Sequence, residues 1–171
     1  MILLKNVLVA TDFSEPSDAA LAYGRALAQR FDATLHLLHV AENVFTRSFG
    51  GESYVTLLPD LQRDLEDDAR KRLHERLTDN DQNALPAKPV LVTSNAPATA
   101  IVAYAKEASI DLIVMGTHGR SGVSHMLMGS IAERVVRTAG CPVLTVRHPE
   151  HDFVVPDALV AVSARGSRKT S

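Results

Sequence analysis

Short apolar runs alternate with segments of helical periodicity along most of this chain, and this alternation limits the folds open to it. Runs of strand length occupy residues 6–10, 34–40, 89–93, 111–115 and 142–147. Between the first two runs, apolar or small residues recur at spacings of three and four, at Ala20, Tyr23 or Gly24, Leu27 and Phe31. Strands that are apolar on both faces and joined by helices form parallel sheets covered on both sides. We therefore predict an α/β fold, a doubly wound five-stranded parallel sheet with helices on both faces.

The segment from Leu58 to Leu77 is predicted to be an amphipathic surface helix. Its apolar face would consist of Leu58, Leu61, Leu65, Ala69, Leu73 and Leu77. Opposite charges lie four residues apart on its other faces, in the pairs Glu66 with Arg70, Asp67 with Lys71 and Asp68 with Arg72. We expect this run of charges to be a solvated face and not part of a binding site.

Length and charge narrow the class of protein. A chain of 171 residues with 46% hydrophobic residues suits one core domain, which we place at 1–147, followed by a C-terminal extension at 148–171. The net charge of -2 provides no basic surface for nucleic acid. Cys141 is the only cysteine, and no apolar run approaches the length of a membrane span. We expect a cytoplasmic protein without nucleic-acid partners or membrane insertion.

A glycine-rich loop follows the fourth strand, where residues 115–130 read MGTHGRSGVSHMLMGS. In doubly wound sheets, ligands bind at the carboxyl ends of the strands where the winding direction reverses. Gly116 and Gly119 would let the backbone turn and approach a ligand closely. Gly129 and Ser130 open the next predicted helix, whose first N–H groups attract phosphate. The loop is therefore predicted to hold phosphate groups, together with Thr11 and Asp12 at the end of the first strand.

Three blocks of the sequence resemble the universal stress protein family. The spacing of Gly116, Gly119 and the pair Gly129-Ser130 is similar to the family's ATP-binding signature. The opening VLVATDFS (7–14) and the closing CPVLTVR (141–147) are similar to its first and last strands. The resemblance covers roughly residues 3–147. It implies an adenine-nucleotide alpha-hydrolase-like fold with strand order 3-2-1-4-5. It also implies a homodimer formed through the strand from Pro142 to Arg147.

The resemblance also implies a site for ATP, or for AMP or ADP, with Mg²⁺ bound only together with the nucleotide. The adenosine would lie against Ala10, Thr11 and Asp12, and the backbone of Val40 would contact the adenine. The ribose and first phosphates would be lined by Met115, Gly116, His118 and Gly119. The phosphate tail would meet Arg120, Gly129, Ser130 and Ile131. Ala132 departs from the hydroxyl residue that some ATP-binding members have at this position, which removes one phosphate donor.

Several of these residues have simpler interpretations. Asp12 could cap the first helix, and Gly116 and Gly119 could be ordinary turn glycines. His118 and His125 could be solvated loop residues. Since His36 and His39 fall on opposite faces of one strand, we expect no joint metal site there. Cys141 is expected to be an inert core residue.

The sequence thus predicts a stress-response or regulatory protein that uses ATP as a ligand to set its conformation or its choice of a regulated partner protein. No catalytic residue is assigned, and ATP hydrolysis would be slow at most. One alternative is a nucleotide-independent, dimeric interaction module of the same fold. A less favoured alternative is an adenylyl-transfer or ATP-hydrolysing enzyme, but ATDFS (10–14) lacks the pyrophosphate motifs of the adenylyl-transfer group. No G-x-G-x-x-G follows the first strand, which argues against a dinucleotide-binding dehydrogenase.

Two stretches lack a clear pattern. Residues 42–56 form a long connection after the second strand, which could close over the adenine. The tail 148–171 has an apolar part that could pack on a partner subunit, and its polar end is expected to be disordered.

Overall fold

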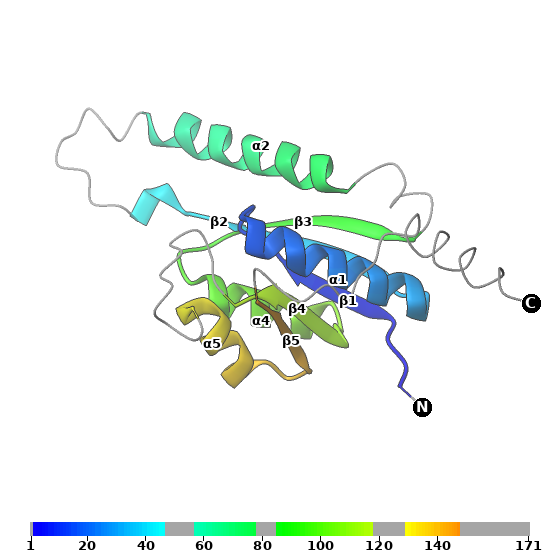
Figure 1. The fold of residues 1–171 in the computed structure, drawn as a ribbon. Coiled ribbons are helices and arrows are strands. Elements are labelled where there is room, and N and C mark those ends of the chain that lie inside the picture. The colour runs from blue at the N-terminus through cyan, green and yellow to red at the C-terminus, as the bar shows by residue number, and fades with distance from the viewer. Residues whose placement is uncertain (1, 47–56, 78–84, 118–128, 148–171) are drawn as a thin grey trace, which may run out of the picture.

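Five parallel strands form one sheet in the computed structural model, which describes residues 2–46, 57–77, 85–117 and 129–147. The strands are β1 (Asn6–Ala10), β2 (Thr34–Ala41), β3 (Ala87–Thr93), β4 (Leu112–Gly116) and β5 (Val143–Val146). Their order is β3-β2-β1-β4-β5, as predicted (Figure 1). The chain therefore runs outward from β1 to β3 and then returns to the other side of β1. This places the reversal of winding between β1 and β4.

Helices cover both faces of the sheet. On one face lie α1 (Glu15–Phe31) and α2 (Leu58–Arg76), and on the other lie α4 (Pro97–Glu107) and α5 (Ser130–Thr138) (Figure 1). A short 3-10 helix, η1 (Val44–Thr46), follows β2. The predicted helices and strands are all present with the predicted type. Their ends differ from the predicted ones by a residue or two, as is usual for such boundaries.

The core consists of two apolar layers, one on each side of the sheet. Along β1, Val7 and Val9 face the layer under α1 and α2, whereas Leu8 and Ala10 face the layer under α4 and α5. Val7, Leu8 and Val9 have no exposed surface. Because both faces of the central strands are buried, their sequences are continuously apolar, which is the pattern that predicted a parallel sheet. Burial of each of the valine and leucine side chains of β1 stabilises the fold by about 1.5–3 kcal/mol.

Two glycines allow helix α1 to approach the sheet closely. A Cβ atom on Gly24 would lie 2.2 Å from Cγ2 of Val9, so α1 crosses β1 over this position. A Cβ atom on Gly116 would lie 3.0 Å from the carbonyl oxygen of Pro16, in the first turn of α1. Gly116 is the last residue of β4, so its role in packing differs from the sharp turn that the sequence predicted.

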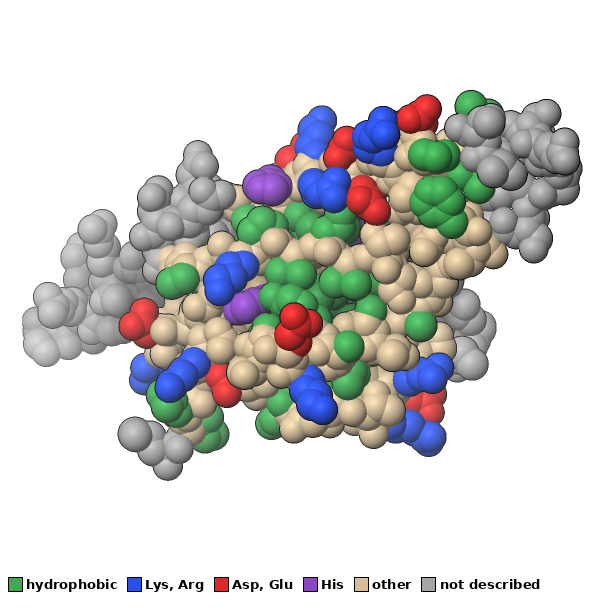
Figure 2. Space-filling view, turned by 180° about the vertical axis from the view of Figure 1, so that it is seen from behind, with side chains coloured by type: hydrophobic (Ala, Val, Ile, Leu, Met, Phe, Trp, Pro, Cys, Tyr) green, Lys and Arg blue, Asp and Glu red, His purple; other side chains and the backbone are tan. Residues whose placement is uncertain are grey.

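Helix α2 buries a narrower face than its sequence predicted. Its buried residues are Leu58, Gln62, Ala69 and Leu73, whereas Leu61 and Leu65 are 42% and 40% exposed. Since α2 packs on β2 and β3 at one edge of the sheet, only part of its apolar stripe meets the core. Hydrophobic side chains are visible where α2 begins, and charges of both signs lie along the rest of the helix (Figure 2).

The ion pairs of α2 differ from the predicted set at one position. Glu66 with Arg70 and Asp68 with Arg72 form as predicted. Asp67 instead pairs with Arg70 at 2.8 Å, and Lys71 pairs with Glu75. All of these side chains are at least partly exposed, so each pair contributes little to stability.

Candidate functional site

A cavity of about 550 Å³ opens at the carboxyl end of the sheet, above the reversal between β1 and β4. All of the predicted site residues that the structure describes line it: Ala10, Thr11, Asp12, Val40, Met115, Gly116, Gly129, Ser130 and Ile131. His118, Gly119 and Arg120 lie outside the described residues. Segments from the ends of three strands, β1, β2 and β4, and the start of α5 thus meet around one space, whose volume falls within the range of small-molecule sites.

Backbone hydrogen bonds bring these segments together. The N–H of Thr11 donates to the carbonyl of Leu38 at 2.8 Å, which holds the end of β1 against β2. The N–H of Gly129 donates to the carbonyl of Thr117 at 2.7 Å, which places the start of α5 beside the end of β4. Gly129 is the N-cap of α5, and among the described residues no side-chain hydrogen bond caps this helix end. Because an α-helix leaves its first N–H groups without intrahelical partners, the cavity has hydrogen-bond donors and a positive dipole on this side.

The turn after β1 is held by hydroxyl groups. The Oγ1 atom of Thr11 accepts the N–H of Phe13 at 3.0 Å and lies 3.0 Å from Oγ of Ser17. The Ser17 hydroxyl donates to the carbonyl of Ser14 at 2.8 Å, so Thr11 is the donor to Ser17. The Thr11 side chain, 6% exposed, therefore builds the turn, although the residue also lines the cavity.

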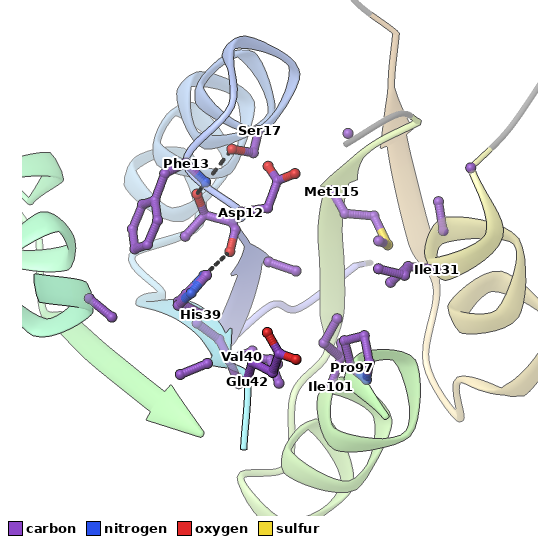
Figure 3. A pocket seen from close by; sticks show the side chains of 18 of the residues that line it. Asp12, Phe13, Ser17, His39, Val40, Glu42, Pro97, Ile101, Met115 and Ile131 are labelled. Atoms are coloured by element: carbon purple, nitrogen blue, oxygen red, sulfur yellow. Dashed lines mark hydrogen bonds between the residues drawn. The ribbon is translucent and has the colours of Figure 1, made fainter. Parts of the chain in front are cut away.

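Asp12 stabilises the same turn, and its described hydrogen bonds are to Ser14 and not to the first-turn N–H groups of α1. Its Oδ1 atom accepts the N–H of Ser14 at 3.2 Å and the Ser14 hydroxyl at 2.5 Å. Ser14 is the N-cap of α1, but its side chain makes no capping hydrogen bond. The Asp12 carboxylate faces the cavity beside β4 (Figure 3). Asp12 thus has a local hydrogen-bonding role and a position suited to contacting a ligand.

The cavity has two sides with different chemistry. Met115, Ile131, Pro97 and Ile101 form an apolar wall near α4 and α5 (Figure 3). Phe13 and His39 lie on the α2 side, with ring centroids 4.3 Å apart. The Nδ1–H of His39 donates to the carbonyl of Thr11 at 2.8 Å, because a carbonyl can only accept. An adenine-sized planar ligand would find apolar contacts on one side and aromatic and polar groups on the other.

Sequence reasoning missed several residues that line the cavity: Phe13, Ser17, Leu38, His39, Ala41, Glu42, Leu65, Asp68, Ala69, Arg72, Pro97, Ile101 and Thr117. Phe13, Glu42 and Thr117 follow strands, so their position after a strand end was a usable signal. Asp68 and Arg72 belong to the charged face of α2 that we expected to be only solvated. No spacing in the sequence shows that α2 reaches the end of the sheet.

A polar network places Glu42 at the cavity edge. The Gln62 side chain, 8% exposed, accepts the N–H of Val44 at 2.9 Å and donates to the carbonyl of Glu42 at 3.2 Å. Gln62 also donates to Glu66, which accepts the Thr93 hydroxyl at 2.8 Å. The hydrogen bonds to Glu66, first that from Thr93 and then that from Gln62, hold the pKa of the Glu66 carboxyl below its ordinary value. Helix α2 is thereby tied to the segment that follows β2.

The two histidines of β2 lie on opposite faces of the sheet, as predicted. His39 lies in the cavity, whereas His36 is 3% exposed and its Nδ1 atom lies 2.7 Å from the Tyr104 hydroxyl of α4. Burial, and then the charge of Lys88, lower the pKa of His36. Among the described residues, no three His, Cys, Asp or Glu side chains are grouped as metal ligands.

Cys141 is half-buried beside the layer under α4 and α5. Burial, and then the charge of Asp111, raise the pKa of its thiol, so at neutral pH it is a weak nucleophile, in agreement with the predicted inert role. No described helix has the length and apolar character needed to cross a membrane.

Comparisons with known proteins agree with this fold. Residues 4–147 match the model of the universal stress protein family. The universal stress protein YxiE of Bacillus subtilis is 32% identical, with 85% of this chain and 100% of YxiE covered. The solved structure of MJ0577, from Methanocaldococcus jannaschii, is 26% identical, has a TM-score of 0.74, and covers 88% of this chain and 100% of its own.

A second solved structure is a universal stress protein in complex with cAMP. It is 25% identical with a TM-score of 0.61, and the match covers 85% of this chain and 98% of that protein. The family match spans every described strand and helix, and the relatives are covered over nearly their whole length. This chain therefore belongs to the universal stress protein family.

Proposed function

We propose that this protein binds an adenine nucleotide, ATP or else AMP or ADP, in the cavity between β1 and β4, and acts as a cytoplasmic stress-response or regulatory protein. One observation carries the proposal: every described residue of the predicted nucleotide site lines the same cavity. The relative solved with cAMP supports an adenine nucleotide as the class of ligand. His118, Gly119 and Arg120 belong to the proposed site as predictions from the sequence.

The proposed orientation is the one that the family resemblance implies, and the chemistry of the cavity walls is compatible with it. The adenosine lies against Ala10, Thr11 and Asp12, with the adenine edge at the backbone of Val40. The phosphates lie at the start of α5, where Gly129 and Ser130 offer N–H groups and a hydroxyl donor. Mg²⁺ would enter only with the nucleotide, as a counter-ion of the phosphates.

The nucleotide is proposed to be a ligand and not an efficiently consumed substrate. Efficient hydrolysis needs a group that positions or deprotonates the attacking water near the terminal phosphate. The described residues at the phosphate end are Gly129, Ser130, Ile131 and Ala132, and none of them carries a base at neutral pH. Binding would then act by favouring one conformation or one regulated partner protein.

The substitution Gly129→Val tests the proposed site. The backbone at Gly129 has φ -70° and ψ 151°, which valine adopts without strain, so the fold should be retained. Its methyl groups would obstruct the approach of phosphate to the first turn of α5. We expect the affinity for ATP in a calorimetric titration to fall by more than about tenfold, with an unchanged circular dichroism spectrum.

The same titration distinguishes the alternatives. ATP, ADP, AMP and cAMP are each titrated into the wild-type chain, and nucleotide released from freshly purified protein is identified by mass spectrometry. No binding of any of the four would favour a nucleotide-independent interaction module. Binding that Gly129→Val leaves unchanged would contradict the placement of the phosphates at α5.

A further inference from the structure

The turn between β1 and α1 contains a bulky residue in an unfavourable backbone conformation. Phe13 has a φ of 65°, in the left-handed region where an L residue with a Cβ atom is strained and glycine is not. Asp12 and Thr11, which line the cavity, immediately precede it. If Phe13 relaxed to a negative φ, the peptide groups on either side of it would rotate. The direction of the Asp12 side chain therefore depends on what holds Phe13 in place.

Contacts from α2 reach this turn in addition to the hydrogen bonds of Thr11 and Asp12 within it. Nη2 of Arg76 donates to the carbonyl of Phe13 at 3.3 Å, and the same guanidinium forms a two-point ion pair with Asp18 of α1, at 2.7 and 3.2 Å. The Arg76 side chain is only 21% exposed. Arg25 of α1 donates in turn to the backbone carbonyl of Arg76. The position of the guanidinium is thus fixed from both helices.

The ring of Phe13 is held separately from its carbonyl. The guanidinium carbons of Arg72 and Arg76 lie 4.2 and 4.9 Å from its centroid, and the His39 ring lies 4.3 Å away. Arg72 contacts the ring, whereas Arg76 contacts both the ring and the carbonyl. Among the described contacts, Arg76 is therefore the side chain that links the backbone of the strained turn to α2 and to α1.

We propose that Arg76 is a positioning residue for the nucleotide site: it holds Phe13 in the left-handed conformation and so keeps the Thr11-Asp12 turn in its binding geometry. Arg76 does not line the cavity, so it acts through the turn and not on the ligand. The inference rests on the proposed nucleotide binding. It adds that α2, a surface helix, is mechanically connected to the ligand site.

Substitutions at position 13 separate the backbone effect from the ring effect. Phe13→Ala and Phe13→Gly both remove the ring, but only glycine removes the penalty for a positive φ. Arg76→Ala is made in the wild-type, Phe13→Ala and Phe13→Gly backgrounds, and ATP affinity is measured by calorimetry. Urea unfolding of each variant records stability separately. Arg63→Ala serves as the matched control. Arg63 is an exposed arginine of α2 whose described ion pair is with Asp60, and it lies outside the cavity.

We expect Arg76→Ala to weaken ATP binding by about tenfold in the wild-type and Phe13→Ala backgrounds, the loss expected for one misplaced polar contact. In the Phe13→Gly background the same substitution should change affinity by less than about threefold, because glycine needs no partner to hold that φ. Arg63→Ala should bind as the wild type does. If Arg76→Ala does not fold, Arg76→Lys replaces it, since an ammonium group cannot contact Asp18 and the Phe13 carbonyl with the same fork geometry.

Two results would overturn the role of Arg76. One is an Arg76→Ala protein that binds ATP as tightly as the wild type. The other is an equal loss of affinity in the Phe13→Ala and Phe13→Gly backgrounds, which would show that Arg76 acts on stability or charge and not on the strained turn. A wild-type chain that binds no nucleotide would overturn the proposed function itself, and the role of Arg76 with it.

Discussion

At the scale of single residues, Asp12 has two roles that substitutions can separate. Its Oδ1 atom accepts two hydrogen bonds from Ser14, and its carboxylate faces the cavity. Asparagine keeps an oxygen that can accept the Ser14 N–H, whereas alanine does not. We predict that Asp12→Asn and Asp12→Ala both weaken ATP binding by about tenfold, while only Asp12→Ala lowers the free energy of unfolding, by about 1 kcal/mol. Calorimetry and urea unfolding measure the two effects. Wild-type affinity in Asp12→Asn would restrict the carboxylate to the turn.

His36 should make stability depend on pH. Its ring nitrogens lie within hydrogen-bond distance of the Tyr104 hydroxyl and the Asn6 side-chain oxygen, an arrangement that a neutral ring satisfies with Nε2–H donating to Asn6 and Nδ1 accepting from Tyr104. Its folded pKa is lowered from 6.5 by burial and by Lys88, so acid favours the unfolded state, which takes up a proton first. The contribution of His36 to the free energy of unfolding is complete above the pKa that His36 has in the unfolded chain. It is lost as the pH falls from that pKa towards the lower pKa of the folded state, by at most about 1.4 kcal/mol per pH unit.

The variant His36→Gln isolates this effect, since glutamine keeps hydrogen-bonding groups and does not titrate. Urea unfolding at about pH 7.5 and about pH 5.5 should show a larger loss of stability for the wild type than for the variant. Identical losses in the two proteins would assign the pH dependence to other groups.

At the scale of elements, the packing of α1 on β1 depends on Gly24. Alanine is preferred over glycine in a helix by about 1 kcal/mol. A Cβ atom here, however, would lie 2.2 Å from Val9, which is completely buried. We predict that Gly24→Ala destabilises the protein by about 1–3 kcal/mol through overpacking.

The companion variant Val9→Ala removes the opposing Cγ2 atom. In that background, Gly24→Ala should be neutral or should stabilise the fold, and urea unfolding of the four proteins measures the coupling. A Gly24→Ala protein more stable than the wild type would show that α1 can shift away from the strand at no cost.

Strands that are buried on both faces of the sheet were the elements most easily predicted from the sequence. The central strands β1 and β4 are apolar because both faces are covered, so their existence and type followed from the sequence alone. The strand order came from the family resemblance. The sequence predicted the length of helix α2 but not which of its apolar residues face the sheet. Periodicity shows that a helix has an apolar face, but it does not show how much of that face the sheet covers. Leu61 and Leu65 are exposed for that reason.

The candidate site was predicted where it follows strand ends, and missed where it depends on tertiary packing. Thr11, Gly116 and Gly129 lie at ends of elements, where ligands bind in this architecture. Arg72 and Asp68 reach the cavity only because α2 extends over the end of β2. The left-handed backbone of Phe13 left no signal either, since a glycine or an asparagine is the residue expected at a positive φ.

At the scale of the whole molecule, the described sheet ends in an edge strand that suggests how the protein assembles. β5 pairs with β4 along one side, and Val143, Leu144 and Thr145 are only partly buried. The N–H and C=O groups on the outer side of an edge strand can pair with another strand, so an apolar edge is usually covered. A second copy related by a two-fold axis would place the two β5 edges antiparallel. We propose a homodimer formed through residues 142–147.

The substitution Thr145→Lys tests this interface. A lysine from each subunit near the axis would place like charges close together, without removing a backbone donor as proline would. Since Thr145 does not line the cavity, nucleotide affinity should be unchanged. We expect sedimentation velocity at micromolar concentration to show a dimeric wild type and a variant shifted towards monomer, both binding ATP equally well. A wild-type chain that is monomeric under these conditions would refute pairing through β5, and a dimer insensitive to Thr145→Lys would place the interface on another surface.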